Sequence, residues 1–232
     1  MFTLHRFQNC KRLERCMERL EHSGSVPGGV KAAYQAYHFA LVHKLRSAER
    51  NLIGLEQVLK SYSAPTTATG APQFLFEANM YLDGFFYCGG SAFDILAREV
   101  LSYFGILPTG NVYYGHAKAE LHANRPGDPL LPRLGDPPWK DSFSHYRNTL
   151  THELLLATNY TISVRLDGRS VQQQAVVPLP DDPRVPAGSR TYDENPDAAE
   201  YIRNHFRRLV SHINAIYGEL EPRMNTKGSL PL

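Results

Sequence analysis

The sequence predicts a mainly α-helical protein, a bundle of about four main helices with an inserted loop and a small β-hairpin. Three observations support this fold class. Apolar residues recur every three or four positions over several long stretches, which is the period of an amphipathic helix. Around Asp167-Gly168 the period shortens and β-branched residues become common, which indicates a hairpin. Proline and glycine gather in residues 105–140, between helical stretches, and indicate a loop there.

Composition limits the classes of protein that this chain can belong to. Its 232 residues are 42% hydrophobic, enough for a substantial core. The formal net charge of +2 predicts no general affinity for polyanions, so any nucleic-acid contact must come from a local cluster of basic side chains. The cysteines are odd in number and lack CxxC spacing, which favours neither a disulfide framework nor a zinc knuckle: Cys10, Cys16 and Cys88.

Localisation is predicted from what the sequence does not display. The first residues alternate charged and apolar groups and do not resemble a secretory signal. The most apolar long stretch, residues 74–104, is interrupted by charged side chains such as Glu77, so no membrane span is predicted. We therefore expect a cytoplasmic protein in a reducing compartment.

The first half of the chain is expected to contain an N-terminal amphipathic helix and two long bundle helices. Residues 1–29 hold the short helix, over 3–21, and a linker. The bundle domain is assigned to 30–220, and its first helix runs from 30 to about 62. After a connection at 63–72, the second helix covers about 73–104. It is apolar nearly all round, so we expect it to be buried.

Gly89 and Gly90 lie in the middle of that second helix. Each glycine costs roughly 1 kcal/mol there relative to alanine. The pair therefore predicts either the close approach of another helix or a kink.

The second half is expected to contain two insertions and two further helices. The insertions cover 105–140, with a short helix around 117–123, and 159–194, which includes the hairpin. Asn195-Pro196 is predicted as the N-cap and first position of a last helix over 198–220, followed by a flexible tail at 221–232.

The central stretch, residues 141–160, carries the candidate chemistry. Its pattern predicts a helix on which His145, Asn148 and His152 share one polar face, since they are spaced i, i+3 and i+7. Arg147 lies in the first turns, where its long side chain can reach a ligand near His152. The apolar residues at other angles are expected to be buried: Leu150, Leu154, Leu155, Leu156 and Ala157.

Two acidic residues of the second helix are candidates for supporting this face. Asp83 and Asp94 belong to a polar line along a mostly apolar helix. One interpretation is a buried or interfacial hydrogen-bond network. The other is that one of the two carboxylates orients a histidine or arginine of the site. The sequence does not choose between the two acids.

The 105–140 insertion is locally basic, with His116, Lys118, His122, Arg125 and Arg133. Such a segment suits contact with a phosphate chain. A solvated loop explains the same residues.

Arg147, Asn148 and His152 match the RNxxxH form of the R-x(4-6)-H motif, and in this respect the chain resembles the HEPN superfamily of helical-bundle proteins. Many members are metal-independent ribonucleases and toxins of toxin–antitoxin and defence systems. The order of helices from about residue 30 to 218 also fits, whereas the 105–140 loop and the hairpin depart from a minimal domain. The resemblance implies a homodimer whose two motifs face each other, with RNA as substrate and an antitoxin or defence protein as a possible partner.

The residue types suit that chemistry. Cleaving RNA without a metal or other cofactor requires a base, an acid and a cation beside the phosphate. His152 can be the base or the acid, because imidazole titrates near neutrality. Arg147 offers a planar donor fork to phosphate oxygens, and Asn148 can bind a phosphate or fix the histidine. The expected products are a 2′,3′-cyclic phosphate and a 5′-hydroxyl.

Several alternatives stay open at this stage. His145 can be a second proton-transfer group, a phosphate contact, or a surface residue. A metal site formed by Asp141, His145 and His152 is disfavoured, since the two histidines are roughly 10 Å apart along a helix. The main alternative to an enzyme is a dimerising helical module that uses Arg147 and its neighbours to bind a nucleotide or a protein partner. The motif can also be a chance pattern on a structural helix.

Overall fold

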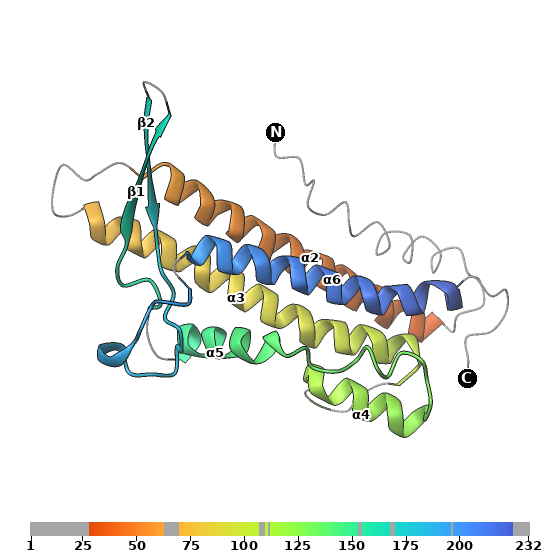
Figure 1. The fold of residues 1–232 in the computed structure, drawn as a ribbon. Coiled ribbons are helices and arrows are strands. Elements are labelled where there is room, and N and C mark those ends of the chain that lie inside the picture. Colours follow the sequence, from red (N-terminus) through yellow and green to blue (C-terminus); the bar gives the residue numbers. More distant parts are fainter. Residues whose placement is uncertain are drawn as a thin grey trace. The chain divides into compact units, whose positions relative to one another are not determined.

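The computed structural model describes residues 28–62, 70–106, 110, 112–152, 155–167, 170–195 and 197–224. It confirms the predicted fold class: the chain is mainly α-helical, with a small two-stranded antiparallel sheet (Figure 1). The N-terminal helix predicted over 3–21 lies outside the described residues, as does most of the 63–72 connection. In the part of the chain that the structure describes, no helix is long and apolar enough to cross a membrane.

The long helices α2, α3 and α6 lie close to their predicted positions. Their bounds are Gly28–Lys60 for α2, Gly70–Tyr103 for α3 and Ala198–Met224 for α6. The last helix thus continues past the expected end at residue 220, and residues 225–232 lie outside the description. The chain forms two compact units. Each of these three helices is divided between them and contributes one segment to each unit.

The first unit comprises residues up to 44, 91–137 and 207 onward. Its centre holds a buried polar contact among three helices. His38 Nδ1 of α2 lies 2.7 Å from Glu99 Oε1 of α3, and the hydroxyl of Tyr217 in α6 donates to the same carboxylate oxygen. All three side chains are buried. These bonds compensate for removing the polar groups from water.

The predicted short helix in this unit is α4, Tyr114–Asn124, which starts earlier than expected. Asp94 Oδ1 accepts a 3.1 Å hydrogen bond from the backbone N–H of Tyr114 at the start of α4. The loop after α4 is held by Asp128, whose carboxylate receives both terminal nitrogens of Arg223. A bidentate pair of this kind is directional, so it fixes the loop on α6.

The second unit comprises residues 45–90 and 138–206. It contains α5, Trp139–His152, and the strands β1, Thr161–Asp167, and β2, Ser170–Val176. The ring of Trp139 lies edge-on to His205 of α6. In the same unit, Arg203 of α6 forms a 2.8 Å ion pair with Glu56 of α2.

The hairpin is confirmed at its predicted position. Asp167 pairs with Ser170 and Thr161 with Val176 in an antiparallel register. In Figure 1 the two strands form a narrow ribbon that projects from the helices of this unit.

The predicted end of the central helix was wrong. The segment 155–160 is not helical, although the run of leucines continues the apolar pattern. Leu156 and Ala157 are buried as expected, but Leu155 is 56% exposed. The reason is a long-range contact: Asn79 Nδ2 donates to the carbonyl of Ala157 at 2.8 Å, and Asn79 Oδ1 accepts from its N–H at 3.0 Å. An amide side chain thus takes both backbone groups that a longer helix would use.

Two smaller expectations also need correction. The N-cap of α6 is Asp197, whose Oδ1 accepts from the N–H of Ala199 at 2.9 Å, whereas Asn195 donates to the hydroxyl of Tyr146. The second long helix is not buried all round. Three large apolar side chains of α3 are more than half exposed: Phe76, Met80 and Tyr87.

Candidate functional site

Helix α5 carries the candidate motif and is seated on two glycines of α3. A methyl group added at Gly89 would lie 2.6 Å from Cζ of Phe143, and one added at Gly90 would lie 2.6 Å from Cδ of Arg147. Carbon atoms do not approach that closely, so only glycine leaves room for these side chains in their observed positions. Phe143 and Arg147 are one turn apart on α5. The glycine pair therefore marks a close helix approach, which confirms one of the two predicted explanations.

This seat fixes the course of the Arg147 side chain. Its Nε would lie 3.1 Å and its Cζ 3.6 Å from a methyl at Gly90, so the whole end of the side chain crosses α3 at that point. Phe143 is 2% exposed and packs against Phe85 and Phe86 of α3. The aromatic contact anchors α5, and Arg147, one turn further along, is partly exposed.

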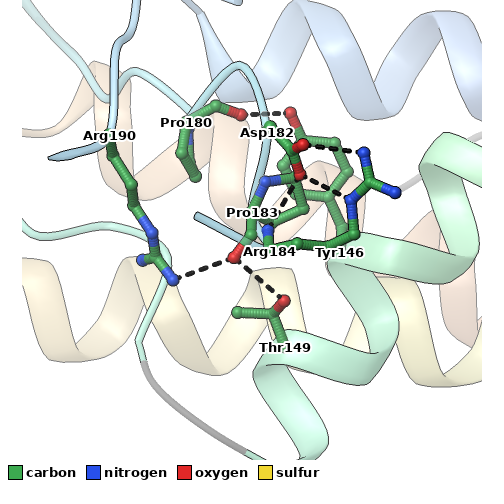
Figure 2. A network of polar contacts seen from close by, with 7 residues as sticks. All are labelled: Tyr146, Thr149, Pro180, Asp182, Pro183, Arg184 and Arg190. Carbon is green, nitrogen blue, oxygen red and sulfur yellow. Dashed lines mark hydrogen bonds and ion pairs between the residues drawn. The ribbon is translucent and has the colours of Figure 1, made fainter. Parts of the chain in front are cut away.

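An adjacent side of α5 is fixed by the loop that follows the hairpin. The hydroxyl of Tyr146 donates to the carbonyl of Pro180, and the hydroxyl of Thr149 donates to that of Pro183 at 3.3 Å (Figure 2). Arg190 Nη2 donates to the same Pro183 carbonyl at 3.0 Å. Tyr146 and Thr149 are both buried, and burial raises the pKa of the Tyr146 hydroxyl, which stays a donor. The helix is thus held from two sides.

The loop also carries an ion pair beside the motif. Arg184 Nε and Nη2 donate to the two carboxylate oxygens of Asp182 at 2.8 and 2.7 Å (Figure 2). These bonds lower the pKa of Asp182 to about 2, and the charge of His145 adds to the effect. His145 therefore lies close enough to the loop to interact electrostatically with Asp182.

The three motif residues and His145 do not all share one environment. His145 and Arg147 are partly exposed, and Asn148 is exposed. His152 is the last residue of α5, and its side chain lies outside the described part of the structure. By helical geometry the positions 145, 148 and 152 fall within about 60° of one another, whereas 147 lies about 140° from 152. The expectation of a shared face thus holds for the helix positions of the histidines and Asn148, and Arg147 lies toward α3.

The candidate supporting acids have different surroundings. Asp83 is exposed on α3, in the same unit as α5. Asp94 belongs to the first unit, where its carboxylate holds the start of α4. This bond is an observed structural role for Asp94.

Two features of this site were not predicted. The first is the particular pairing of Gly90 with Arg147, for which two adjacent mid-helix glycines are the only signal in the sequence. The second is a line of exposed side chains on α3, which we call the α3 stripe: Phe76, Met80, Asp83 and Tyr87. Their spacing of four, three and four residues places them on one face of the helix. An apolar surface of this kind commonly marks an interaction site.

The basic insertion presents its charges on α4. His116, Lys118 and His122 are exposed there, and the guanidinium carbon of Arg125 lies 5.1 Å from the centre of the Phe104 ring. Among the described residues, no group of three or more His, Cys, Asp or Glu side chains is arranged to hold a metal ion.

Comparisons with protein-family models, curated proteins and solved structures gave no match for this chain.

Proposed function

We propose that the protein is a metal-independent endoribonuclease of the HEPN type, which cleaves RNA at a site shared by two copies of the chain. The observation that carries this proposal is the placement of Arg147. Its stem is held across Gly90 of α3, and Arg147 is partly exposed. Contact of the stem with α3 limits the directions that the guanidinium can take, which reduces the entropy lost when it binds a phosphate.

The proposed reaction is an internal transesterification. A neutral imidazole takes the proton of the ribose 2′-hydroxyl, and the resulting oxygen attacks the adjacent phosphorus. The bond from phosphorus to the 5′-oxygen breaks, and a protonated imidazole gives its proton to that oxygen. The products are a 2′,3′-cyclic phosphate and a 5′-hydroxyl, while Arg147 stabilises the additional negative charge on the phosphorane.

Helical geometry supports the sharing of the site between two copies. Positions 147 and 152 are about 140° apart around α5, so the guanidinium and the imidazole of one copy leave the helix in different directions. Two proton transfers also require two proton carriers, and a twofold pair supplies two copies of His152. In a cytoplasmic setting, such an activity suits a toxin or defence nuclease that is restrained by an antitoxin.

Residues around the motif take supporting roles in this proposal. Asn148 contacts a phosphate or the histidine, and His145 contacts the phosphate chain. Asp83, which lies in the same unit as α5, supports the site by orienting a histidine or arginine. Asp94 retains the structural role that its bond to α4 shows.

The experiment is incubation of the purified protein with mixed RNA in excess EDTA. We expect cleavage with cyclic-phosphate ends in the wild type, and a loss of at least about 100-fold in Arg147→Ala and His152→Ala. Matched controls are Arg46→Ala and His43→Ala, two exposed residues of α2, which should retain full activity. Cleavage that survives both motif substitutions would identify the activity as a contaminant or place it elsewhere in the chain.

A further inference from the structure

Arg190, in the loop that follows the hairpin, is held beside the face of α5 that carries the histidine positions. Its Nη2 donates to the carbonyl of Pro183 at 3.0 Å, and the same carbonyl accepts from the hydroxyl of Thr149 at 3.3 Å (Figure 2). Around the helix, position 149 lies within about 60° of both 145 and 152. The guanidinium of Arg190 is therefore placed on the histidine side of α5.

The charge of this guanidinium is not matched by an acid. Its Nε donates to the carbonyl of Val185 at 2.9 Å, so both of its bonds go to neutral groups. Among the described residues, no carboxylate pairs with Arg190. Arg184 of the same loop differs, because its charge is matched by Asp182. A partly buried cation is normally paired with an anion, and a guanidinium suits the oxygens of a phosphate group.

The two bonds of Arg190 leave one edge of its guanidinium available. The Nε–H and one hydrogen of Nη2 are used by the carbonyls, whereas Nη1 is buried and has no acceptor among the described residues. A buried donor without an acceptor is unfavourable, so a ligand oxygen that reaches this edge gains a charge-assisted bond. Arg190 as a residue is partly exposed, and the side-chain adjustment that admits a ligand is common on binding.

We propose that Arg190 is a phosphate-binding residue, which holds a phosphate group by this edge of its guanidinium, beside the histidine face of α5. A phosphate suits this place better than a carboxylate, because its additional oxygens can accept from His145 and Asn148 on that face. The anion site depends only on the contacts of Arg190. It rests on the proposed function for the source of the phosphate, which is then the RNA backbone.

The first test is thermal unfolding of the whole chain in inorganic phosphate, compared with potassium chloride at equal ionic strength. We expect about 10 mM phosphate to raise the melting temperature of the wild type by about 3 °C or more, and that of Arg190→Met by less than about 1 °C. Arg190→Lys should respond to an intermediate extent, since it keeps the charge and loses the planar fork. Arg207→Met, at an exposed arginine of α6, is the matched control and should respond like the wild type.

The second test identifies the source of the phosphate. A fluorescent single-stranded RNA with 2′-O-methyl riboses has no free 2′-hydroxyl, so its binding is measured by anisotropy without cleavage. We expect Arg190→Met to raise its dissociation constant about tenfold or more, because a charge-assisted bond to phosphate is lost. Inorganic phosphate should compete with this RNA. Binding of phosphate through Arg190 without binding of the RNA would keep the anion site and remove the RNA backbone as its source.

Two results overturn the site itself. The first is a wild type whose melting temperature does not respond to phosphate. The second is an equal response in Arg190→Met, which would place the phosphate elsewhere on the chain. Circular dichroism shows whether each variant is folded, and Arg190→Lys replaces Arg190→Met if the latter is not. A phosphate response that requires Arg190, in a protein that cleaves no RNA, would contradict the proposed nuclease and leave the anion site supported.

Discussion

Exchanging Gly89 and Gly90 of α3 for alanine, one at a time, tests how the motif helix is positioned. Both substitutions insert one methyl group, and each methyl would lie 2.6 Å from a side-chain carbon of α5. At Gly89 the obstacle is the ring of Phe143, and at Gly90 it is the stem of Arg147. The two variants therefore add the same group with the same initial overlap, and they differ in the side chain of α5 that must move.

The expected magnitudes follow from the freedom of the two obstacles. Alanine gains roughly 1 kcal/mol over glycine within a helix, at either position. Phe143 is 2% exposed and packed among aromatic rings, so it has no space to retreat and overpacking costs about 1–3 kcal/mol. The end of the Arg147 side chain is flexible and partly exposed, so it can move aside at little cost. Gly89→Ala should destabilise by up to about 2 kcal/mol, and Gly90→Ala should be within about 1 kcal/mol of wild type.

The assay is urea unfolding followed by circular dichroism, combined with RNA cleavage below the unfolding transition. We expect Gly90→Ala to keep its stability and lose cleavage, because the guanidinium no longer crosses α3 where the native chain places it. Gly89→Ala should lose stability. Equal destabilisation by both substitutions would refute the reasoning about the flexible stem, and full cleavage by a stable Gly90→Ala variant would refute the role of the glycine in placing Arg147.

The remaining predictions concern the scaffold. Tyr146→Phe should destabilise the chain by about 1–2 kcal/mol in urea unfolding, because the buried carbonyl of Pro180 loses its donor; an unchanged midpoint would contradict this. Asn79→Ala should lower the free energy of unfolding by about 2–4 kcal/mol and accelerate hydrogen exchange of the Ala157 amide. An amide that stays protected in this variant would contradict the prediction. Burial lowers the pKa of His212 below the ordinary histidine value of about 6.5. The unfolded chain therefore binds more protons, and stability falls as pH drops through and below that value. The melting temperature of His212→Gln should therefore fall less between pH 7.5 and 5.5 than that of the wild type, and equal losses would contradict this.

The long helices could be predicted because their cores are periodic in the sequence. Residues such as Leu41, Leu45 and Leu52 recur at helical spacing and are fully buried. The hairpin followed from the turn signal after a run of β-branched residues, and the glycine pair indicated either a close helix approach or a kink. These signals are local, so a single sequence reveals them.

The missed features depend on contacts between distant residues. Nothing near Leu155 or Ala157 shows that Asn79 will take the backbone groups of Ala157 and end the helical pattern. The attachment of α5 to the loop uses carbonyl acceptors, which every residue has, so Tyr146 and Thr149 give no sign of their partners. For the same reason the sequence pointed to the glycine pair but not to Arg147 as its partner.

The exposure of the α3 stripe could not be predicted either. A helix that is apolar nearly all round normally lies inside a protein, and the sequence does not show that one face of α3 is left uncovered. A binding surface has the same composition as a core, because both exclude water. Only the structure separates Phe76 and Met80, which are exposed, from Leu82, which is buried.

Cleavage rate per chain as a function of protein concentration is the most direct measurement of a site built by two copies. With EDTA present, the rate per chain should rise with concentration in proportion to the dimer fraction, and it should vanish when the protein is diluted to monomer. A rate per chain that stays constant through dissociation would show that one chain suffices and would contradict the shared site. Dimerisation without RNA cleavage at any concentration would favour a dimerising module that binds a nucleotide or a protein partner.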